Sequence, residues 1–208
     1  MTDEYQRIAP WYDLLIDPFN RALRPIGLSL FQPAEGARVL EVGCGTGTQL
    51  AFYQDQGYRV AGIDLSPAML QVARGRLAGR SSICRGDAAR LPYPDDSFDL
   101  VLAALVLHEM APPQRLAVLE DMSRVLARNG HIGLIDYHPR PKRSLKGYLA
   151  SAIIHGVERA AGRQHYANYR QFLRDGGVPM LAERLGLSIE RRKHVSGGNI
   201  GIYQLTNL

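Results

Sequence analysis

The stretch VLEVGCGTGT, residues 39–48, decides the fold of this 208-residue chain. It begins with apolar residues suited to a buried strand, passes through Gly43, Gly45 and Gly47, and enters a helical pattern near Thr48. Glycines in a strand-to-helix turn carry no Cβ atom, so a ligand can lie against the backbone and the first amides of the helix. The stretch therefore predicts a ligand site at the end of the first strand.

A second predicted strand, Arg59–Asp64, ends in a carboxylate about 20 residues after the turn, where it can accept both hydroxyl groups of a ribose. The glycine spacing differs from the dinucleotide fingerprint, because Thr48 stands where its third glycine would be. No Gly-Lys-Ser/Thr follows, which excludes a nucleotide-triphosphate loop. Turn and carboxylate together predict a pocket for an adenosine-containing ligand.

Strands and helices alternate from Arg38 onward, which predicts an α/β fold with a mostly parallel sheet. The expected strands are Arg38–Val42, Arg59–Asp64, Ser82–Arg85, Phe98–Ala103, His131–Tyr137, Ser188–Val195 and Ile200–Thr206. The expected helices lie near Thr48–Gln56, Pro67–Leu77, Pro113–Leu126 and Pro179–Leu185, with Asn129-Gly130 as the stop of the third. Only four residues, 196–199, join the last two strands, so these must form an antiparallel hairpin.

Two segments lie outside this pattern. Residues 1–33 are rich in aromatic and aliphatic side chains, and Pro10, Pro18 and Pro25 prevent one long helix. Residues 139–177 form an insertion between the fifth and sixth strands, helical over about 144–161 and 166–174. At this length we expect one domain, residues 1–208.

Composition narrows the class of protein. The formal charge of +5 comes from 25 basic and 20 acidic residues, which predicts a solvated basic surface or a partner with negative charge. The N-terminus is acidic and shows no signal peptide, and the longest apolar run, 100–107, is too short to cross a bilayer. Cys44 and Cys84 do not form a disulfide framework. We therefore expect a soluble, cytoplasmic protein.

Four stretches of the sequence carry a resemblance to a known family. VLEVGCGTG and GIDLSPAML, residues 62–70, resemble motif I and the acidic strand end of class I S-adenosylmethionine-dependent methyltransferases, and GDAARLPYPDDSFDLV, residues 86–101, follows at the interval of that family. YQRIAPWYDLL, residues 5–15, is similar to the opening of the ubiquinone/menaquinone C-methyltransferase-like group. The resemblance implies a seven-stranded Rossmann-like sheet ending in the hairpin, S-adenosyl-L-methionine as cofactor, residues 1–33 as a lid, and methyl transfer to a small, apolar or amphiphilic acceptor.

The same resemblance implies roles for residues. Glu41 and the glycine turn cradle the methionine part, Asp64 holds the ribose, and Asp87 accepts from the adenine amino group. Alternatives remain: Asp87 can be a turn cap, Met69 a core residue, and Cys44 is a small neighbour of the ligand, not a nucleophile. The expected cofactor-binding residues are Tyr12, Glu41, Gly43, Cys44, Gly45, Gly47, Asp64, Leu65, Met69, Gly86, Asp87, Ala88 and Ala104.

His108 follows the fourth strand and is the expected catalytic base, because a histidine near neutral pKa can take a proton from an acidic O–H or C–H acceptor. A packing role in the loop is the alternative, and Glu109 is expected to be a solvated loop acid. The expected acceptor-site residues are Tyr5, Tyr137, His138, Tyr166 and Tyr169, and for Tyr5, Tyr166 and Tyr169 ordinary packing is the alternative.

The sequence also favours some classes of binding partner over others. Arg140, Lys142, Arg143 and Lys146 can contact anionic lipid headgroups, so peripheral membrane association is a second expectation. His155 is expected in the core, and no spacing of His, Cys or Asp indicates a metal site. The chain lacks the loop of base-amino methyltransferases and a basic aromatic stripe, which disfavours nucleic acid.

The match to the quinone group is incomplete. Residues 105–110 replace the signature that true quinone C-methyltransferases carry after the fourth strand, so a quinone acceptor is not implied. A phospholipid-headgroup N-methyltransferase and a non-catalytic cofactor-binding regulator stay open as alternatives. The sequence leaves both a monomer and a homodimer open.

Overall fold

A computed structural model of the chain describes residues 5–6, 9–139 and 144–207. Seven strands form one sheet in the order β3-β2-β1-β4-β5-β7-β6. Pairing is parallel from β3 to β5, whereas β7 runs antiparallel to both β5 and β6, so the predicted sheet and terminal hairpin are confirmed. The strands are β1 Arg38–Val42, β2 Arg59–Asp64, β3 Ser82–Arg85, β4 Phe98–Ala104, β5 Leu126–Tyr137, β6 Ser188–Val195 and β7 Ile200–Thr206.

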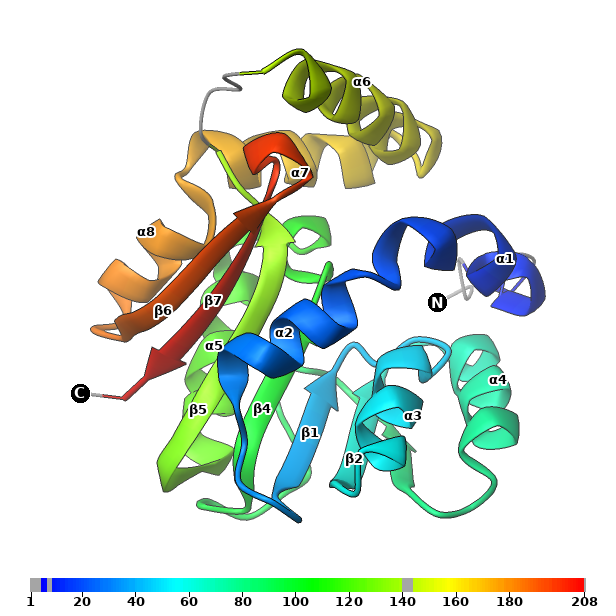
Figure 1. The fold of residues 1–208 in the computed structure, drawn as a ribbon, viewed down its shortest axis with the longest axis vertical. Coiled ribbons are helices and arrows are strands. Elements are labelled where there is room, and N and C mark those ends of the chain that lie inside the picture. Colours follow the sequence, from blue (N-terminus) through cyan, green and yellow to red (C-terminus); the bar gives the residue numbers. More distant parts are fainter. Residues whose placement is uncertain (1–4, 7–8, 140–143, 208) are drawn as a thin grey trace.

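Helices cover both faces of the sheet, as the buried central strands require. Figure 1 shows α2 and α3 in front of the sheet and α5 behind it. Side chains of β1 such as Val39, Leu40 and Val42 are fully buried between these layers. The helices are α1 Ala9–Asn20, α2 Leu23–Phe31, α3 Thr48–Asp55, α4 Pro67–Leu77, α5 Pro112–Val125, α6 Leu145–Ala160, α7 Arg163–Arg174 and α8 Gly177–Arg184, with 3₁₀ turns η1 Leu107–Glu109 and η2 Ser196–Gly198.

The start of β5 differs from the sequence prediction. The strand begins at Leu126, directly after α5, so Asn129-Gly130 lies within the strand and does not end the helix. Leu126 pairs with Phe98 whereas His131 pairs with Leu100, and the residues between them form a bulge. A Cβ atom on Gly130 would lie 2.9 Å from the Asp99 carbonyl oxygen, so the glycine serves this close approach of two strands.

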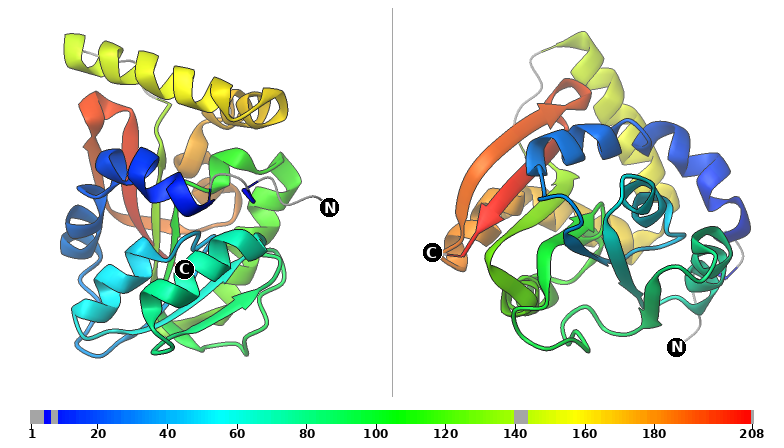
Figure 2. Two further views of the ribbon diagram at one scale, coloured as in Figure 1. Left: turned by 90° about the vertical axis from the view of Figure 1, so that its right-hand side faces the viewer. Right: turned by 60° about the horizontal axis from the view of Figure 1, so that its bottom comes forward.

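The carboxyl ends of the parallel strands lie at one edge of the sheet, the edge at which open α/β folds bind ligands. Helix α1 lies near the β1 and β2 ends of this edge, and α6 crosses above the strand ends farther along (Figures 1 and 2). The predicted insertion forms α6 and α7, of which α6 packs on η2 and α7 on η1. Within the ranges described, no helix combines the length and apolar character that spanning a bilayer needs.

Candidate cofactor and acceptor site

A cavity of about 600 Å³ opens at the carboxyl ends of β1, β2 and β4, beneath α1. The glycine turn after β1 forms its floor. Gly43, Gly45 and Gly47 all adopt positive φ angles of 70°, 52° and 73°, a region that favours glycine. A Cβ atom on Gly43 would lie 2.7 Å from the Val106 side chain, whereas one on Gly45 would meet nothing within 4 Å. The turn therefore presents bare backbone to the cavity at Gly45.

Asp64 ties this turn to the end of β2. One carboxylate oxygen accepts the backbone N–H of Gly45 at 2.8 Å, and the other accepts that of Ser66 at 2.8 Å. Ser66 in turn caps α4, because its hydroxyl accepts the backbone N–H of Met69. A carboxylate held by two backbone donors stays in one orientation toward the cavity.

Glu41 lies in the cavity wall and is almost fully buried. Its Oε2 atom accepts no hydrogen bond from any residue that the structure describes. Burial raises the pKa of Glu41 to about 8, with Asp64 adding to the rise and Arg24 opposing it. Because a buried carboxylate without a donor is costly, this atom is suited to the cation of a ligand.

Helix α1 is fastened over the cavity. The Thr46 hydroxyl donates to Asp13 at 2.5 Å, and the Arg76 guanidinium pairs with the other oxygen of Asp13 at 2.5 Å. Upstream of α1, the Tyr5 hydroxyl donates to Glu109 at 3.0 Å. These contacts connect Tyr5 to η1 and α1 to the glycine turn and α4, so α1 lies over the cavity.

Most of the predicted cofactor-binding residues meet around this cavity. Two do not line it. Gly47, which directly precedes α3, lies against Ala73 of α4. Asp87 is exposed, and its carboxylate accepts the backbone N–H of Ala89. Those in the lining are Tyr12, Glu41, Gly43, Cys44, Gly45, Asp64, Leu65, Met69, Gly86, Ala88 and Ala104, together with Tyr5 from the predicted acceptor site. Burial raises the pKa of the Cys44 thiol, which keeps it protonated and unreactive.

His108 lies elsewhere than expected. Its ring is buried outside the cavity lining, with Nδ1 2.8 Å from Asp136 Oδ1. Burial alone lowers the pKa of His108, but Asp136 and Glu158 raise it to about 10. In this placement the ring neither faces the cavity nor is ready to accept a proton.

The remaining acceptor-site candidates also lie outside the cavity lining. Tyr137 donates to Glu158 at 2.7 Å and packs edge-on against Tyr169, and Tyr166 lies beside Tyr169. His138 bonds the Tyr203 hydroxyl at 2.6 Å. Tyr137, Tyr166 and Tyr169 thus connect the end of β5 to α6 and α7, whereas His138 packs on Tyr203 of β7 and His194 of β6. Of the basic run, Arg140, Lys142 and Arg143 lie outside the described residues, and Lys146 is exposed.

Glu109 corrects the sequence interpretation. It was expected to be a solvated loop acid, yet it lies in the cavity wall, where burial raises its pKa and Tyr5 donates to it. His155, expected in the core, is only half-buried. Glu109 and His108 are neighbours in sequence, and only the 3₁₀ turn η1 puts the former in the cavity and the latter outside it. No motif in the sequence signals that turn.

A family model described as a methyltransferase domain matches residues 40–134. An uncharacterised methyltransferase of Synechocystis sp. is 30% identical over 169 residues, which cover 81% of this chain and 75% of that protein. The chain belongs to the S-adenosyl-L-methionine-dependent methyltransferases. S-adenosyl-L-methionine is the methyl donor typical of this family.

Other relatives of this methyltransferase are named for different methyl acceptors. A demethylmenaquinone methyltransferase of Clavibacter sepedonicus is 33% identical over 65% of this chain and 58% of its own length. A phosphatidylethanolamine N-methyltransferase of Cereibacter sphaeroides is 36% identical over 54% of this chain and 56% of its own length. The chain thus spans less than two thirds of the length of such relatives.

A solved structure shows the same fold. A chain from the complex between the Haloferax volcanii Trm112 methyltransferase activator and the putative methyltransferase superposes with a TM-score of 0.74, at 20% identity over the whole of both chains. The relatives bear names with different acceptors, so they establish the family and leave the acceptor of this methyltransferase open.

Proposed function

We propose that this chain transfers the methyl group of S-adenosyl-L-methionine to a small, apolar or amphiphilic acceptor. The observation that carries the proposal is the surplus of acidic over basic side chains around the cavity. Its wall holds the acids Asp13, Asp17, Glu41, Asp64 and Glu109 against the two bases Arg24 and Arg85, although the chain as a whole has a formal charge of +5. The cofactor carries a sulfonium and an ammonium against one carboxylate, so an acidic cavity in a basic protein suits it.

The residues present fit this cofactor. Glu41 would hold the ammonium through Oε2, the oxygen that accepts no hydrogen bond from the described residues, and the bare backbone at Gly45 would hold the methionine part. Asp64, at the end of β2, would accept the ribose hydroxyls. Leu65, Met69, Gly86 and Ala88 line the part of the cavity assigned to the adenine. Two unpaired cysteines favour a reducing cytoplasm as the compartment.

When bound, the cofactor supplies a methyl group on a sulfonium, a leaving group that is already activated. The work of the protein is therefore to align the acceptor and to exclude water. The contacts of Asp13 with Thr46 and Arg76 hold α1 over the cavity for this purpose. An O–H or C–H acceptor additionally has to lose a proton.

We assign the general base to Glu109 in place of His108. Glu109 lies in the cavity wall next to Met110 and near the end of β4, whereas His108 does not line the cavity. Burial raises the pKa of Glu109 above that of a free glutamate, which strengthens it as a base. The Tyr5 hydroxyl holds the carboxylate in place.

We predict that Glu109→Gln lowers turnover by about 100-fold, the scale of general-base catalysis, without changing cofactor affinity. The measurement is release of S-adenosyl-L-homocysteine with a panel of phenols, quinols and enolisable acids, and Glu120→Gln on the exposed side of α5 is the matched control. Full turnover in Glu109→Gln would show that Glu109 is not the general base. Cofactor binding with no turnover on any acceptor would favour the non-catalytic regulator.

The surface of α6 favours a second candidate function, methylation of a membrane lipid. The exposed side chains Leu145, Leu149, Ile153 and Val157 follow one another every four residues, and the exposed Tyr148 lies three residues after Leu145, so these side chains form one apolar stripe. Lys146 and Arg159 are exposed on the same helix and can meet anionic headgroups. The relative named as a phosphatidylethanolamine N-methyltransferase supports this candidate.

This candidate predicts that the protein sediments with vesicles of phosphatidylcholine and phosphatidylglycerol at low salt. The double variant Leu149→Glu and Ile153→Glu should reduce the bound fraction by at least about 10-fold, because it puts two charges into the apolar stripe. Binding of wild-type protein to neither these vesicles nor neutral ones would remove membrane lipid as the acceptor class and leave the small-molecule proposal standing.

A further inference from the structure

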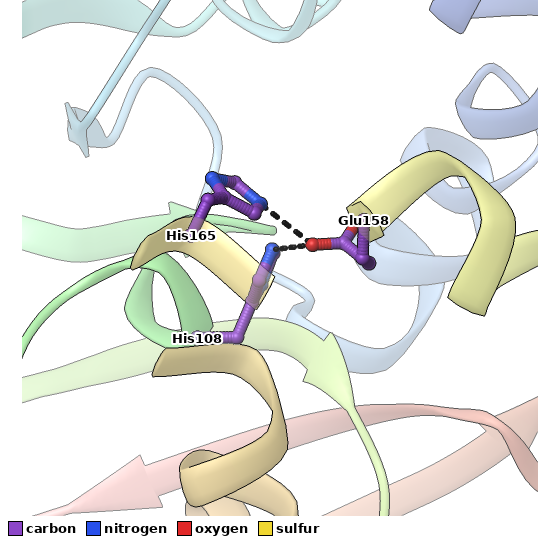
Figure 3. A group of neighbouring side chains, drawn as sticks. All are labelled: His108, Glu158 and His165. Carbon is purple, nitrogen blue, oxygen red and sulfur yellow. Dashed lines mark hydrogen bonds and ion pairs between the residues drawn. The ribbon is translucent and has the colours of Figure 1, made fainter. Parts of the chain in front are cut away.

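A second cluster of chemically capable side chains lies outside the cavity. His108 from η1, Glu158 from α6 and His165 from α7 point toward one another (Figure 3). His165 Nε2 lies 2.6 Å and His108 Nε2 lies 3.3 Å from the same oxygen, Glu158 Oε2. The side chains of His108, Glu158 and His165 are only 2%, 6% and 19% exposed. Two imidazole nitrogens and a carboxylate oxygen thus converge in a nearly dry space.

We propose that these three side chains bind one divalent transition-metal ion, for which Zn²⁺ is the best match. Two histidines and one glutamate are an established ligand set for zinc, with a fourth position left for water or a ligand oxygen. Bond lengths near 2.0–2.1 Å in a tetrahedral site put ligand atoms about 3.3 Å apart. The His108–Glu158 separation of 3.3 Å already has this value, and all three donor atoms lie within 4.8 Å of one another.

The surroundings orient the ligands as metal sites require. Asp136 Oδ1 lies 2.8 Å from His108 Nδ1 and so directs the other ring nitrogen, Nε2, toward the cluster. Asp136 is itself fixed, because it accepts backbone N–H groups of Leu107 and Tyr137. The Tyr137 hydroxyl donates to Glu158 Oε1 and leaves Oε2 for the ion. A carboxylate behind the ligating histidine and a donor on the ligating carboxylate are the usual outer contacts of a metal site.

Charge and position agree with such an ion. Asp136 and Glu158 are buried acids, and one dication would neutralise both once the two imidazoles have released their extra protons and bind as neutral ligands. The ligands come from three elements that are separated in sequence, so the ion joins α6 and α7 to η1. Since η1 also carries Glu109, the metal would hold η1 in place next to the cavity. Metal binding by these three side chains would occur with or without methyl transfer.

The test is metal binding by the full chain after treatment with a chelator. We expect one Zn²⁺ or Co²⁺ per chain by calorimetry, a tetrahedral Co²⁺ absorption spectrum without thiolate bands, and a higher melting temperature with Zn²⁺. His165→Ala should weaken binding by at least about 100-fold, since even the loss of an outer contact costs 10- to 100-fold. If His165→Ala does not fold, His165→Gln, which can still donate to Glu158, replaces it.

The matched control is His155→Ala. His155 is a half-buried histidine on α6 that contacts Ser151 and Tyr169 and is not in the cluster, so its variant should bind metal as wild-type protein does. No stoichiometric binding by wild-type protein would overturn the proposal and leave a buried ionic network of His108, Glu158 and His165. Equal affinity in His165→Ala and wild type, or a thiolate band from Cys44 or Cys84, would overturn it as well.

Discussion

Asp64→Ala is expected to weaken binding of S-adenosyl-L-methionine by at least about 100-fold. The side chain is the only carboxylate at the end of β2, and it both holds the Gly45 and Ser66 amides and accepts the two ribose hydroxyls in our proposal. A hydrogen bond to a charged group contributes about 1.5–3 kcal/mol, so the loss of two of them corresponds to a factor of 100 or more. Isothermal titration calorimetry measures the affinity directly.

A control separates binding from folding. Asp99 accepts the backbone N–H of Arg38 at 2.8 Å, far from the cavity, so Asp99→Ala also removes a carboxylate bonded to a backbone amide. We expect Asp99→Ala to bind the cofactor as wild type does. Circular dichroism should show that both variants keep the fold. Unchanged affinity in a folded Asp64→Ala protein would contradict the assignment of the ribose site.

Glu41→Gln is expected to change stability and binding in opposite directions. Burial raises the pKa of Glu41 from 4.5 in the unfolded chain to about 8 in the folded protein. Its contribution to stability is therefore complete below pH 4.5 and is lost as the pH rises to about 8. Glutamine does not ionise, so the cofactor-free variant should be more stable than wild type above this range, by up to about 4–5 kcal/mol at 1.36 kcal/mol per pKa unit.

Bound cofactor is expected to offset the higher stability of Glu41→Gln. Once the ammonium pairs with the carboxylate, the charge at Glu41 is compensated, so Glu41→Gln should bind the cofactor at least about 10-fold more weakly. Urea unfolding between pH 6 and 9, with and without cofactor, measures both effects, and Glu120→Gln on the surface should show neither. A variant that is less stable than wild type at pH 9, or that binds equally well, would show that Glu41 has another role.

The fold was predictable because its signals are local. The glycine turn, the acid that ends β2 and the four-residue link before β7 each constrain the backbone within a few residues. The start of β5 could not be predicted from the sequence, because it depends on a bulge where Gly130 approaches Asp99 of β4. Helix and strand propensities contain no information about such an approach.

The site residues also divide into those placed by local sequence and those placed by contacts between distant segments. The predicted residues on the turns after β1 and β2 line the cavity, with Gly47 as the exception, since those turns are part of the sheet edge. His108 and Glu109 could not be distinguished, because the side of η1 that each occupies depends on Leu105, which has a φ angle of 54°, and on Asp136. The convergence of His108, Glu158 and His165 depends on how α6 and α7 fold back over the edge, which no local pattern encodes.

The most direct test of the cofactor site is a crystal structure of the full chain with S-adenosyl-L-homocysteine. The account predicts the ribose hydroxyls at Asp64, the ammonium at Glu41 Oε2 and the methionine part along the backbone of Gly43–Gly45. A ligand bound at another surface, or a glycine turn blocked by side chains when the ligand is present, would contradict it.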